Sequence, residues 1–304
     1  RLLRFMAARG RVMTLKTIRN GTDNTVQIRG EYVPGAKAGT SVAIFCPHAV
    51  EPWGPHSPEE TGIGGSEEAV VYLSEALARR GIAVDVYAPI PADLLPFRVH
   101  AGVRWMPLSD FRPDLVADHL VALRAPWLAR LPQLKKTAAV PWIWHHDHGY
   151  DAAAWAPSIA KNARHLYVSQ WQRDAREVTA GPNSGAGIYN GIPADQVRSA
   201  GLRRDARDPF KCVWASMPTR RLDRLMAMWP RIKERWPAAS LDIYYGHHTA
   251  VQLWRATQPH MARTLAMLEA AILAAAPLGV QWKGRVGQIA LTQARLCLSW
   301  SSDV

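Results

Sequence analysis

The sequence predicts an α/β protein with two Rossmann-like domains, each a doubly wound parallel sheet. Short apolar runs alternate with amphipathic segments along most of the 304 residues, as strands and helices do in such sheets. At 48% hydrophobic and 20% charged, the chain can bury a large core, and its length suits two domains. The polar, charged stretch 196–209 is the expected linker between them.

The first predicted unit is a strand, a helix and a second strand. Residues 41–46, "SVAIFC", form the apolar run that a parallel strand buried on both faces requires. The helix follows the glycines of "TGIGGSEEAV" and ends before Gly81, a C-terminal cap, and "IAVDVYAP" is the next strand. The residues expected on the helix's apolar face are Ala69, Leu73, Ala76 and Leu77. A parallel crossover is therefore expected.

The predicted domain boundaries follow changes in composition. Residues 1–38 have mixed charge and turn signals and are expected to be a tail or linker. Residues 39–195 form the first domain, and residues 210–304 form part of a second. Because the chain starts at Arg1 rather than Met and ends in a strand-like segment, we expect a chain cut at both ends, with the second domain incomplete.

The net charge limits which partners the protein can bind, and the cysteine spacing limits which metal sites or disulfides it can form. The net charge of +12 would suit nucleic acid, but no zinc-finger, RNP-like or Lys/Arg-block motif accompanies it, so nucleic acid is disfavoured. A basic face that meets anionic lipid or a phosphorylated small molecule explains the charge equally well. Cys46, Cys212 and Cys297 lie far apart, which indicates neither a zinc site nor a disulfide framework.

The sequence also predicts where the protein acts. No uninterrupted apolar stretch reaches the roughly 18 residues of a membrane span, and the apolar block near residue 1 is too short for a secretory signal. We therefore expect a cytoplasmic protein, with peripheral contact at the inner face of the membrane as an option.

The glycine turn before the first predicted helix has two possible roles, anion binding and a tight connection from strand to helix. Gly64, Gly65 and Ser66 precede a helix N-terminus, where backbone amides bind anions such as phosphate. However, "GIGGSE" matches neither the dinucleotide fingerprint nor a P-loop, and glycine also serves a tight strand-to-helix turn. We expect this loop to face phosphates or an acceptor as well as to make the turn.

Six segments in order resemble the motifs of a known family. "TGIGGSEEAVVYLSEALARRGIAVDVY" resembles "GGxE…LA…L…RGHxVxV", "WIWHHDH" resembles "LWLHD", "YVSQWQRD" resembles "xxSxWxR" and "IYNGIP" resembles "xPNGID". "ASMPTRRLDRLMAMWP" and "VQWKGRVGQIAL" are similar to "ASSPDRGLDRLLEAWP" and "VxFHGRVxQxEL". The family is that of the retaining, nucleotide-sugar-dependent glycosyltransferases of GT-B fold, the group 1 or family 4 type. The resemblance covers about residues 41–299.

The resemblance implies a donor site in the second domain. Arg220 matches the arginine of "PDRG" and is expected to meet the donor diphosphate, whereas Arg221 departs from the family's glycine. Cations and backbone amides suit this role because the departing diphosphate gathers negative charge. The nucleotide base is expected near Gly284, Arg285 and Val286. Solvated arginines and a plain glycine turn are the alternative readings of these positions.

The first domain supplies the expected catalytic residues. His146 and Asp147 match the family's "HD" and follow a strand, so the resemblance implies that they contact the sugar. A metal site made by His145, His146 and His148 is disfavoured, because adjacent residues of an extended segment point to opposite sides. Asn190 and Gly191 form a turn expected to face the cleft that the resemblance implies, and left-handed turn geometry alone is the alternative.

The resemblance implies transfer of a sugar from a nucleotide-sugar to an unknown glycan, lipid or protein acceptor, with retention of configuration and no metal or other cofactor. The family's acidic "ExxxxxxxE" segment is not found, so we expect this chain to be weakly active or inactive. The alternative is a non-catalytic module that binds a glycan or acts as a scaffold.

Overall fold

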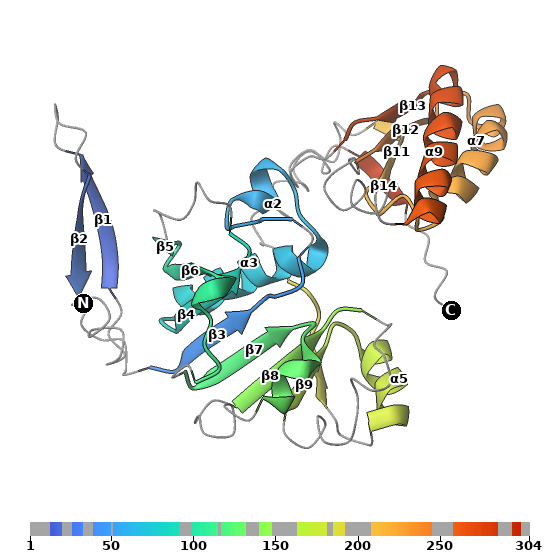
Figure 1. The fold of residues 1–304 in the computed structure, drawn as a ribbon. Helices are drawn as coiled ribbons and strands as arrows, with labels where there is room; N and C mark the ends of the chain where they lie inside the picture. Colours follow the sequence, from blue (N-terminus) through green and yellow to red (C-terminus); the bar gives the residue numbers. More distant parts are fainter. Residues whose placement is uncertain are drawn as a thin grey trace. The chain divides into compact units, whose positions relative to one another are not determined.

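The structure is a computed structural model, and contacts divide it into two compact units, each described here by itself (Figure 1). The first unit comprises residues 1–55 and 65–191, and the second comprises residues 56–64 and 192–304. The structure describes residues 13–19, 26–32, 39–49, 51–90, 99–114, 117–131, 140–147, 163–180, 185–191, 208–244, 258–284 and 294–298.

An antiparallel hairpin lies within the stretch that the sequence predicts as a tail or linker. Strand β1 (Met13–Arg19) pairs with β2 (Val26–Tyr32) along its whole length, from Met13 opposite Tyr32 to Arg19 opposite Val26. The two strands form a sheet of their own, separate from the large sheet of the first unit.

The first unit is built around an eight-stranded sheet in the order β10-β9-β8-β7-β3-β4-β6-β5. Its strands are β3 (Ser41–Phe45), β4 (Ala83–Ala88), β5 (Val99–His100), β6 (Val103–Pro107), β7 (His119–Leu123), β8 (Val140–His145), β9 (Arg164–Tyr167) and β10 (Gly185–Gly187). All neighbours pair in parallel except β5 and β6. The chain builds outward from β3 on one side and then returns to β7, so the sheet is doubly wound and the predicted fold class is confirmed.

Helix α3 (Gly65–Arg79) connects β3 to β4 and ends in a Schellman motif. Gly81 has a φ of 79°, its N–H donates to the Ala78 carbonyl at 2.9 Å, and the N–H of Ile82 donates to the Leu77 carbonyl at 3.2 Å. The expected C-terminal cap is therefore present. The helix's buried residues are Glu67, Ala69, Val70, Val71 and Ser74.

The buried face of α3 is rotated from the predicted one. Of the predicted face, Ala69 is buried, whereas Leu73 and Leu77 are only half-buried. The residues that are buried instead include Glu67, a charged residue outside the predicted apolar face. Its burial depends on an ionic partner, described below, that a count of apolar residues cannot detect.

The remaining elements of the first unit are short, apart from helix α5. They are the 3₁₀ helices η2 (Leu108–Asp110) and η3 (Pro126–Arg130), and α5 (Gln170–Ala180), whereas the short helix α2 (Ser57–Glu60) belongs to the second unit. One core cluster packs beneath η2 and η3, where Phe111 stacks on Phe45 with ring centroids 4.0 Å apart and meets Tyr87 edge-on at 5.3 Å. These apolar contacts anchor the ends of β3 and β4.

The second unit holds a parallel four-stranded sheet in the order β13-β12-β11-β14. Its strands are β11 (Asp208–Trp214), β12 (Ser240–Ile243), β13 (Val280–Trp282) and β14 (Ala294–Leu298), and its helices are α7 (Leu222–Arg235), α9 (Pro259–Ala274) and the 3₁₀ helix η7 (Ala276–Leu278). Helix α9 begins at Pro259, a residue that the first turn of a helix tolerates. Helices α7 and α9 contact each other and lie side by side in Figure 1.

A compact core joins these helices to the sheet of the second unit. Trp229 of α7 is fully buried, and its indole N–H donates to the Leu278 carbonyl at 3.1 Å. Asp242 of β12 is also buried and is paired with Lys211 of β11 at 2.8 Å. In the part of the chain that the structure describes, no helix combines the length and the apolarity that a bilayer span requires.

Candidate functional site

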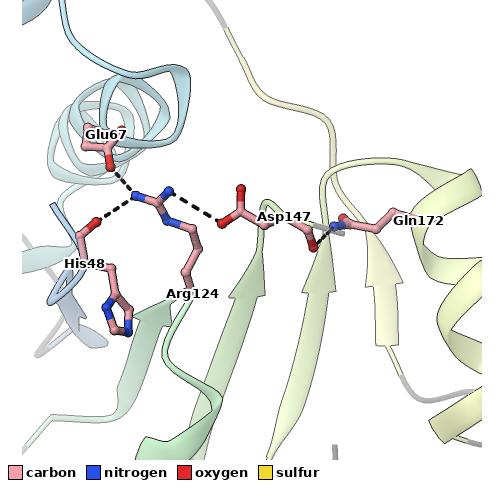
Figure 2. Close-up of polar contacts among 5 residues, drawn as sticks. All are labelled: His48, Glu67, Arg124, Asp147 and Gln172. Carbon is pink, nitrogen blue, oxygen red and sulfur yellow. Dashed lines mark hydrogen bonds and ion pairs between the residues drawn. The ribbon is translucent and has the colours of Figure 1, made fainter. Parts of the chain in front are cut away.

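Arg124 lies at the centre of a polar cluster where β3, β7 and β8 end at one edge of the sheet (Figure 2). Its Nη2 donates to the His48 carbonyl at 2.8 Å and forms an ion pair with Glu67, while Nη1 lies 3.5 Å from a carboxylate oxygen of Asp147. One guanidinium therefore contacts the segment after β3, the first turn of α3 and the segment after β8.

The backbone of Arg124 has an unusual conformation. Its φ is 54°, in the left-handed region that residues other than glycine seldom adopt. Its N–H donates to the Trp144 carbonyl at 2.9 Å, which fastens the end of β7 to the end of β8. Strained backbone of this kind persists where surrounding contacts hold it, and it clusters at functional sites.

His48 and Cys46 lie beside this cluster, after strand β3. Burial, together with the Arg124 cation, lowers the pKa of His48 from its ordinary value, so its imidazole favours the neutral form. The Cys46 thiol is fully buried, and burial, reinforced by the charge of Glu67, raises its pKa well above the ordinary range. Cys46 is therefore a protonated thiol and a poor nucleophile.

His146 is the expected site residue with the most informative surroundings. Its ring meets Trp144 edge-on at 4.7 Å, and burial, followed by the nearby Arg124 cation, lowers its pKa to about 4. Its Nε2 is buried and has no hydrogen-bond partner among the described residues. Since a buried polar atom without a partner costs free energy, this nitrogen is a candidate for binding a ligand hydroxyl.

Asp147, the second expected catalytic residue, is held from two sides. Its carboxylate is 48% exposed and lies against Arg124, and its backbone carbonyl accepts a hydrogen bond from Nε2 of Gln172 at 3.1 Å. Gln172 is buried in the first turn of α5, where its Oε1 accepts from the Val168 N–H at 3.0 Å. The helix start is capped by Ser169, whose hydroxyl accepts from the Gln172 N–H at 3.0 Å.

His145 is separated from His146 by the pleat of the strand. It is buried, with its Nε2 2.9 Å from Nδ1 of His165, and it stacks on Tyr167 at 5.0 Å. No group of three or more His, Cys, Asp or Glu side chains that could hold a metal ion occurs among the described residues, and His148 lies outside them.

The glycine turn lies at the start of α3, next to Glu67. Gly64 and Gly65 are exposed, Ser66 is half-buried, and a Cβ built on Gly65 would meet nothing within 4 Å. Glu67 and Glu68 already place carboxylates in the first turn, where the helix dipole favours negative charge. The open space at Gly65 leaves room for a ligand next to exposed backbone amides.

The structure describes some of the expected donor-binding residues in the second unit. Arg220 is exposed, and its N–H donates to the Met217 carbonyl at 2.9 Å in the turn before α7. Arg221 caps α7 with a φ of 69°, a left-handed conformation that suits the glycine of the motif it departs from. Gly284 has a φ of 75°, whereas Arg285 and Val286 lie outside the described residues.

The turn at Asn190 and Gly191 closes the described part of the first unit. Both residues are exposed, and a Cβ on Gly191 would meet nothing within 4 Å. Among the residues expected in the first unit, the structure therefore brings His146 and Asp147 together with Arg124. It places Asn190 and Gly191 after β10, four strands from β3 in the order of the sheet.

Sequence reasoning missed Arg124, His48 and Gln172 and read Glu67 only as a first-turn charge. A usable signal existed for Arg124, which directly follows the apolar strand "HLVAL" as the His146–Asp147 pair follows β8. Polar residues at the carboxyl ends of parallel strands lie at the edge where ligands bind. No comparable signal marks Gln172, which resembles any polar residue of an amphipathic helix.

No protein-family model matches the sequence, and no curated protein matches it either. The fold is nevertheless similar to solved structures. One is HepE (Alr3699) of Anabaena in complex with UDP and glucose, with a TM-score of 0.55 and 15% identity, covering 85% of this chain and 73% of that one. Another is a glycosyltransferase of Rickettsia africae, with a TM-score of 0.52 and 10% identity, covering 86% and 72%. The chain therefore has a glycosyltransferase-like fold.

Proposed function

We propose that the protein is a glycosyltransferase that moves a sugar from a nucleotide-sugar to a glycan, lipid or protein acceptor. The observation that carries the proposal is the fold shared with HepE of Anabaena, which was solved with UDP and glucose. The polar cluster around Arg124, next to His146, supports the proposal, because ligands of parallel α/β sheets bind beyond the carboxyl ends of the strands.

In this proposal His146 and Asp147 act on the sugar. A neutral imidazole both donates and accepts hydrogen bonds, so the buried Nε2 of His146 suits a sugar hydroxyl as a partner. The half-exposed carboxylate of Asp147 accepts from a second hydroxyl while Arg124 holds it in place. Neither role requires a metal ion or a cofactor beyond the nucleotide-sugar.

Arg220 is proposed to bind the donor diphosphate, with Arg221, Gly284, Arg285 and Val286 near the nucleotide. Its exposure before α7 supports this role, because an arginine at a helix N-terminus opposes the dipole and an anion nearby removes that penalty. Negative charge that develops on the departing diphosphate is stabilised by such a cation. We propose departure and attack on the same face of the sugar, hence retention, without a protein nucleophile.

Donor binding is tested by thermal unfolding with UDP-, GDP- and ADP-sugars. A ligand of the native state raises the melting temperature by mass action, so one nucleotide class should shift it. The shift should disappear in Arg220→Ala and persist in Arg224→Ala, an exposed arginine of α7 that serves as the matched control. Equal shifts in both variants would remove Arg220 from the donor site.

Retention is tested separately, on the product. Proton NMR of the transferred sugar reports its anomeric configuration directly. With an α-linked donor the proposal predicts an α-linked product, and a β-linked product would contradict the retaining mechanism while leaving glycosyl transfer intact.

A non-catalytic glycan-binding or scaffolding role is the second candidate. It is favoured by Arg221, which stands in a left-handed conformation where the resembled motif has glycine. A bulky side chain at a position suited to glycine would crowd a phosphate that approaches the backbone. Binding of a sugar or nucleotide without turnover by any donor would support this candidate.

We also propose that the protein acts in the cytoplasm and contacts the inner face of the membrane peripherally. Helix α7 supports this, because Arg224, Arg231 and Arg235 are exposed at helical spacing beside exposed Met228 and Trp236. Flotation with vesicles containing anionic lipid tests it. Binding at low salt that weakens at high salt is expected, and no flotation at low salt would contradict it.

A further inference from the structure

Arg124 contacts residues on both sides of His146 in the sequence. Its backbone N–H donates to the carbonyl of Trp144, two residues before His146, and its Nη1 pairs with the carboxylate of Asp147, the next residue. The carbonyl of Asp147 is fixed in turn by Gln172 of α5 (Figure 2). The backbone that carries His146 is therefore held on both sides by one residue of the neighbouring strand.

The other end of the guanidinium is anchored firmly. Nη2 contacts both the His48 carbonyl and the Glu67 carboxylate, and the side chains of Arg124 and Glu67 are only 19% and 12% exposed. Arginine suits this position because its planar group presents several donors in a fixed fork, whereas lysine would offer a single point charge. The left-handed backbone of Arg124 persists although few non-glycine residues adopt it.

We propose that Arg124 is a positioning residue of the transfer site, which holds His146 and Asp147 in place by joining the first turn of α3 and the segment after β3 to the segment after β8. This inference rests on the proposed function, because the sugar transfer that Arg124 would assist is itself a proposal. The two terminal nitrogens of Arg124 are occupied by Glu67, His48 and Asp147, so Arg124 orients the residues that meet the sugar.

The charge of Arg124 gives the arrangement a second effect. The cation lies close enough to His146 to add to the effect of burial on its pKa, and the imidazole stays neutral at physiological pH. A neutral ring keeps one acceptor nitrogen, whereas an imidazolium could only donate. Arg124 therefore affects the position of His146 and adds to the lowering of its pKa, which burial dominates.

The test compares three variants by NMR of the full chain without any ligand. In Arg124→Gln the pKa of His146 should rise above about 4 but stay below its ordinary value because burial remains, and the backbone amide signals of His146 and Asp147 should shift. In Arg124→Lys the amide signals should also shift, because the fork is lost, while the pKa stays low because the charge remains. The matched control is Arg104→Gln, which breaks an ion pair with Asp85 in the same sheet, away from the site.

Two results would overturn the inference. One is an unchanged pKa of His146 in a folded Arg124→Gln variant, and the other is unchanged amide signals of His146 and Asp147 in Arg124→Lys. If Arg124→Gln does not fold, the lysine variant alone decides the positioning role. None of these measurements needs a donor, so a wild-type chain that binds no nucleotide-sugar would reject the proposed function without affecting the outcome for Arg124.

If transfer is found, a further readout separates positioning from stability. Arg124→Lys should lower kcat more than it raises KM for the donor, because a displaced His146 loses contacts in the transition state. A change confined to thermal stability, with both constants unchanged, would contradict the proposal.

Discussion

Glu67 in the first turn of α3 forms an ion pair with Arg124 after β7, although the two residues are 57 positions apart in the sequence. Both side chains are largely buried, at 12% and 19% exposure. The pair turns the start of α3 from a surface helix end into one wall of the polar cluster. It also explains why a glutamate can lie on the buried face of that helix.

Glu67→Ala should destabilise the protein by about 2–4 kcal/mol, because it leaves the largely buried Arg124 cation with only the more exposed Asp147 carboxylate, 3.5 Å away, as a charged partner. Glu75→Ala on the same helix is the control, since Glu75 lies 3.6 Å from Arg79 and 3.5 Å from His100, whose side chains are 65% and 34% exposed, and such pairs contribute at most about 1 kcal/mol each. Chemical denaturation measures both values. Equal losses would show that the Glu67–Arg124 pair is no stronger than a surface pair.

Gln172→Ala should cost about 1–3 kcal/mol and move the backbone amide signal of Asp147, because it leaves a buried N–H and carbonyl without partners. Gln170→Ala is the matched control from the same helix, as Gln170 is exposed and contacts Asp174 at 2.8 Å. Chemical denaturation and amide NMR of the two variants measure the loss of stability and the shift of the Asp147 signal. An unmoved Asp147 signal in the Gln172 variant would show that Gln172 does not hold the backbone of Asp147 in place.

Arg221→Gly should change stability by less than about 1 kcal/mol, because relief of the left-handed strain offsets the added freedom of the unfolded chain. Arg224→Gly, inside α7, should instead cost about 1 kcal/mol, the usual penalty for glycine in a helix. Denaturation curves of the two variants give the difference. A larger loss for Arg221→Gly than for Arg224→Gly would mean that the Arg221 side chain makes contacts that outweigh its strain.

The buried histidines predict a loss of stability in acid. Burial lowers the folded pKa of His165 from 6.5 to about 4, so the unfolded chain binds this proton more tightly than the folded one. The stability that the neutral form contributes is full above pH 6.5 and is lost as the pH falls through 4. The whole effect amounts to about 3 kcal/mol for this group.

His165→Gln should therefore flatten the fall in unfolding free energy between pH 6.5 and 4. His260→Gln, which changes an exposed histidine of α9, should keep the wild-type slope. Denaturation at several pH values decides this, and identical slopes for both variants would contradict a buried neutral His165.

Much of the fold was predictable because buried parallel strands leave a strong local signal. The apolar run that became β3 is continuous in sequence, and Gly81 marks a helix end by its backbone conformation alone. The antiparallel hairpin of β1 and β2 was not predicted, because its strands lack a clear apolar period. The edge strand β5 spans two residues and offers no pattern to read.

The site was predictable only in part. His146 and Asp147 could be named because they match the "HD" of the resembled motif and directly follow a strand. Their supports, Arg124 and Gln172, depend on which strands and helices become neighbours, and that order is fixed by tertiary packing. The buried face of α3 was misassigned for the same reason, since the position of Glu67 is explained by its partner rather than by its own hydropathy.

The central claim is that this chain transfers sugar and that His146 takes part. The most direct measurement is the release of nucleotide diphosphate from UDP-, GDP- and ADP-sugars by wild type, His146→Ala and the exposed-site control His260→Ala. We predict release from one nucleotide class by wild type and by the His260 variant, with a loss of at least about tenfold, or 1.4 kcal/mol of transition-state stabilisation, in the His146 variant. Release by the His146 variant at the same rate as by the wild type would contradict the account.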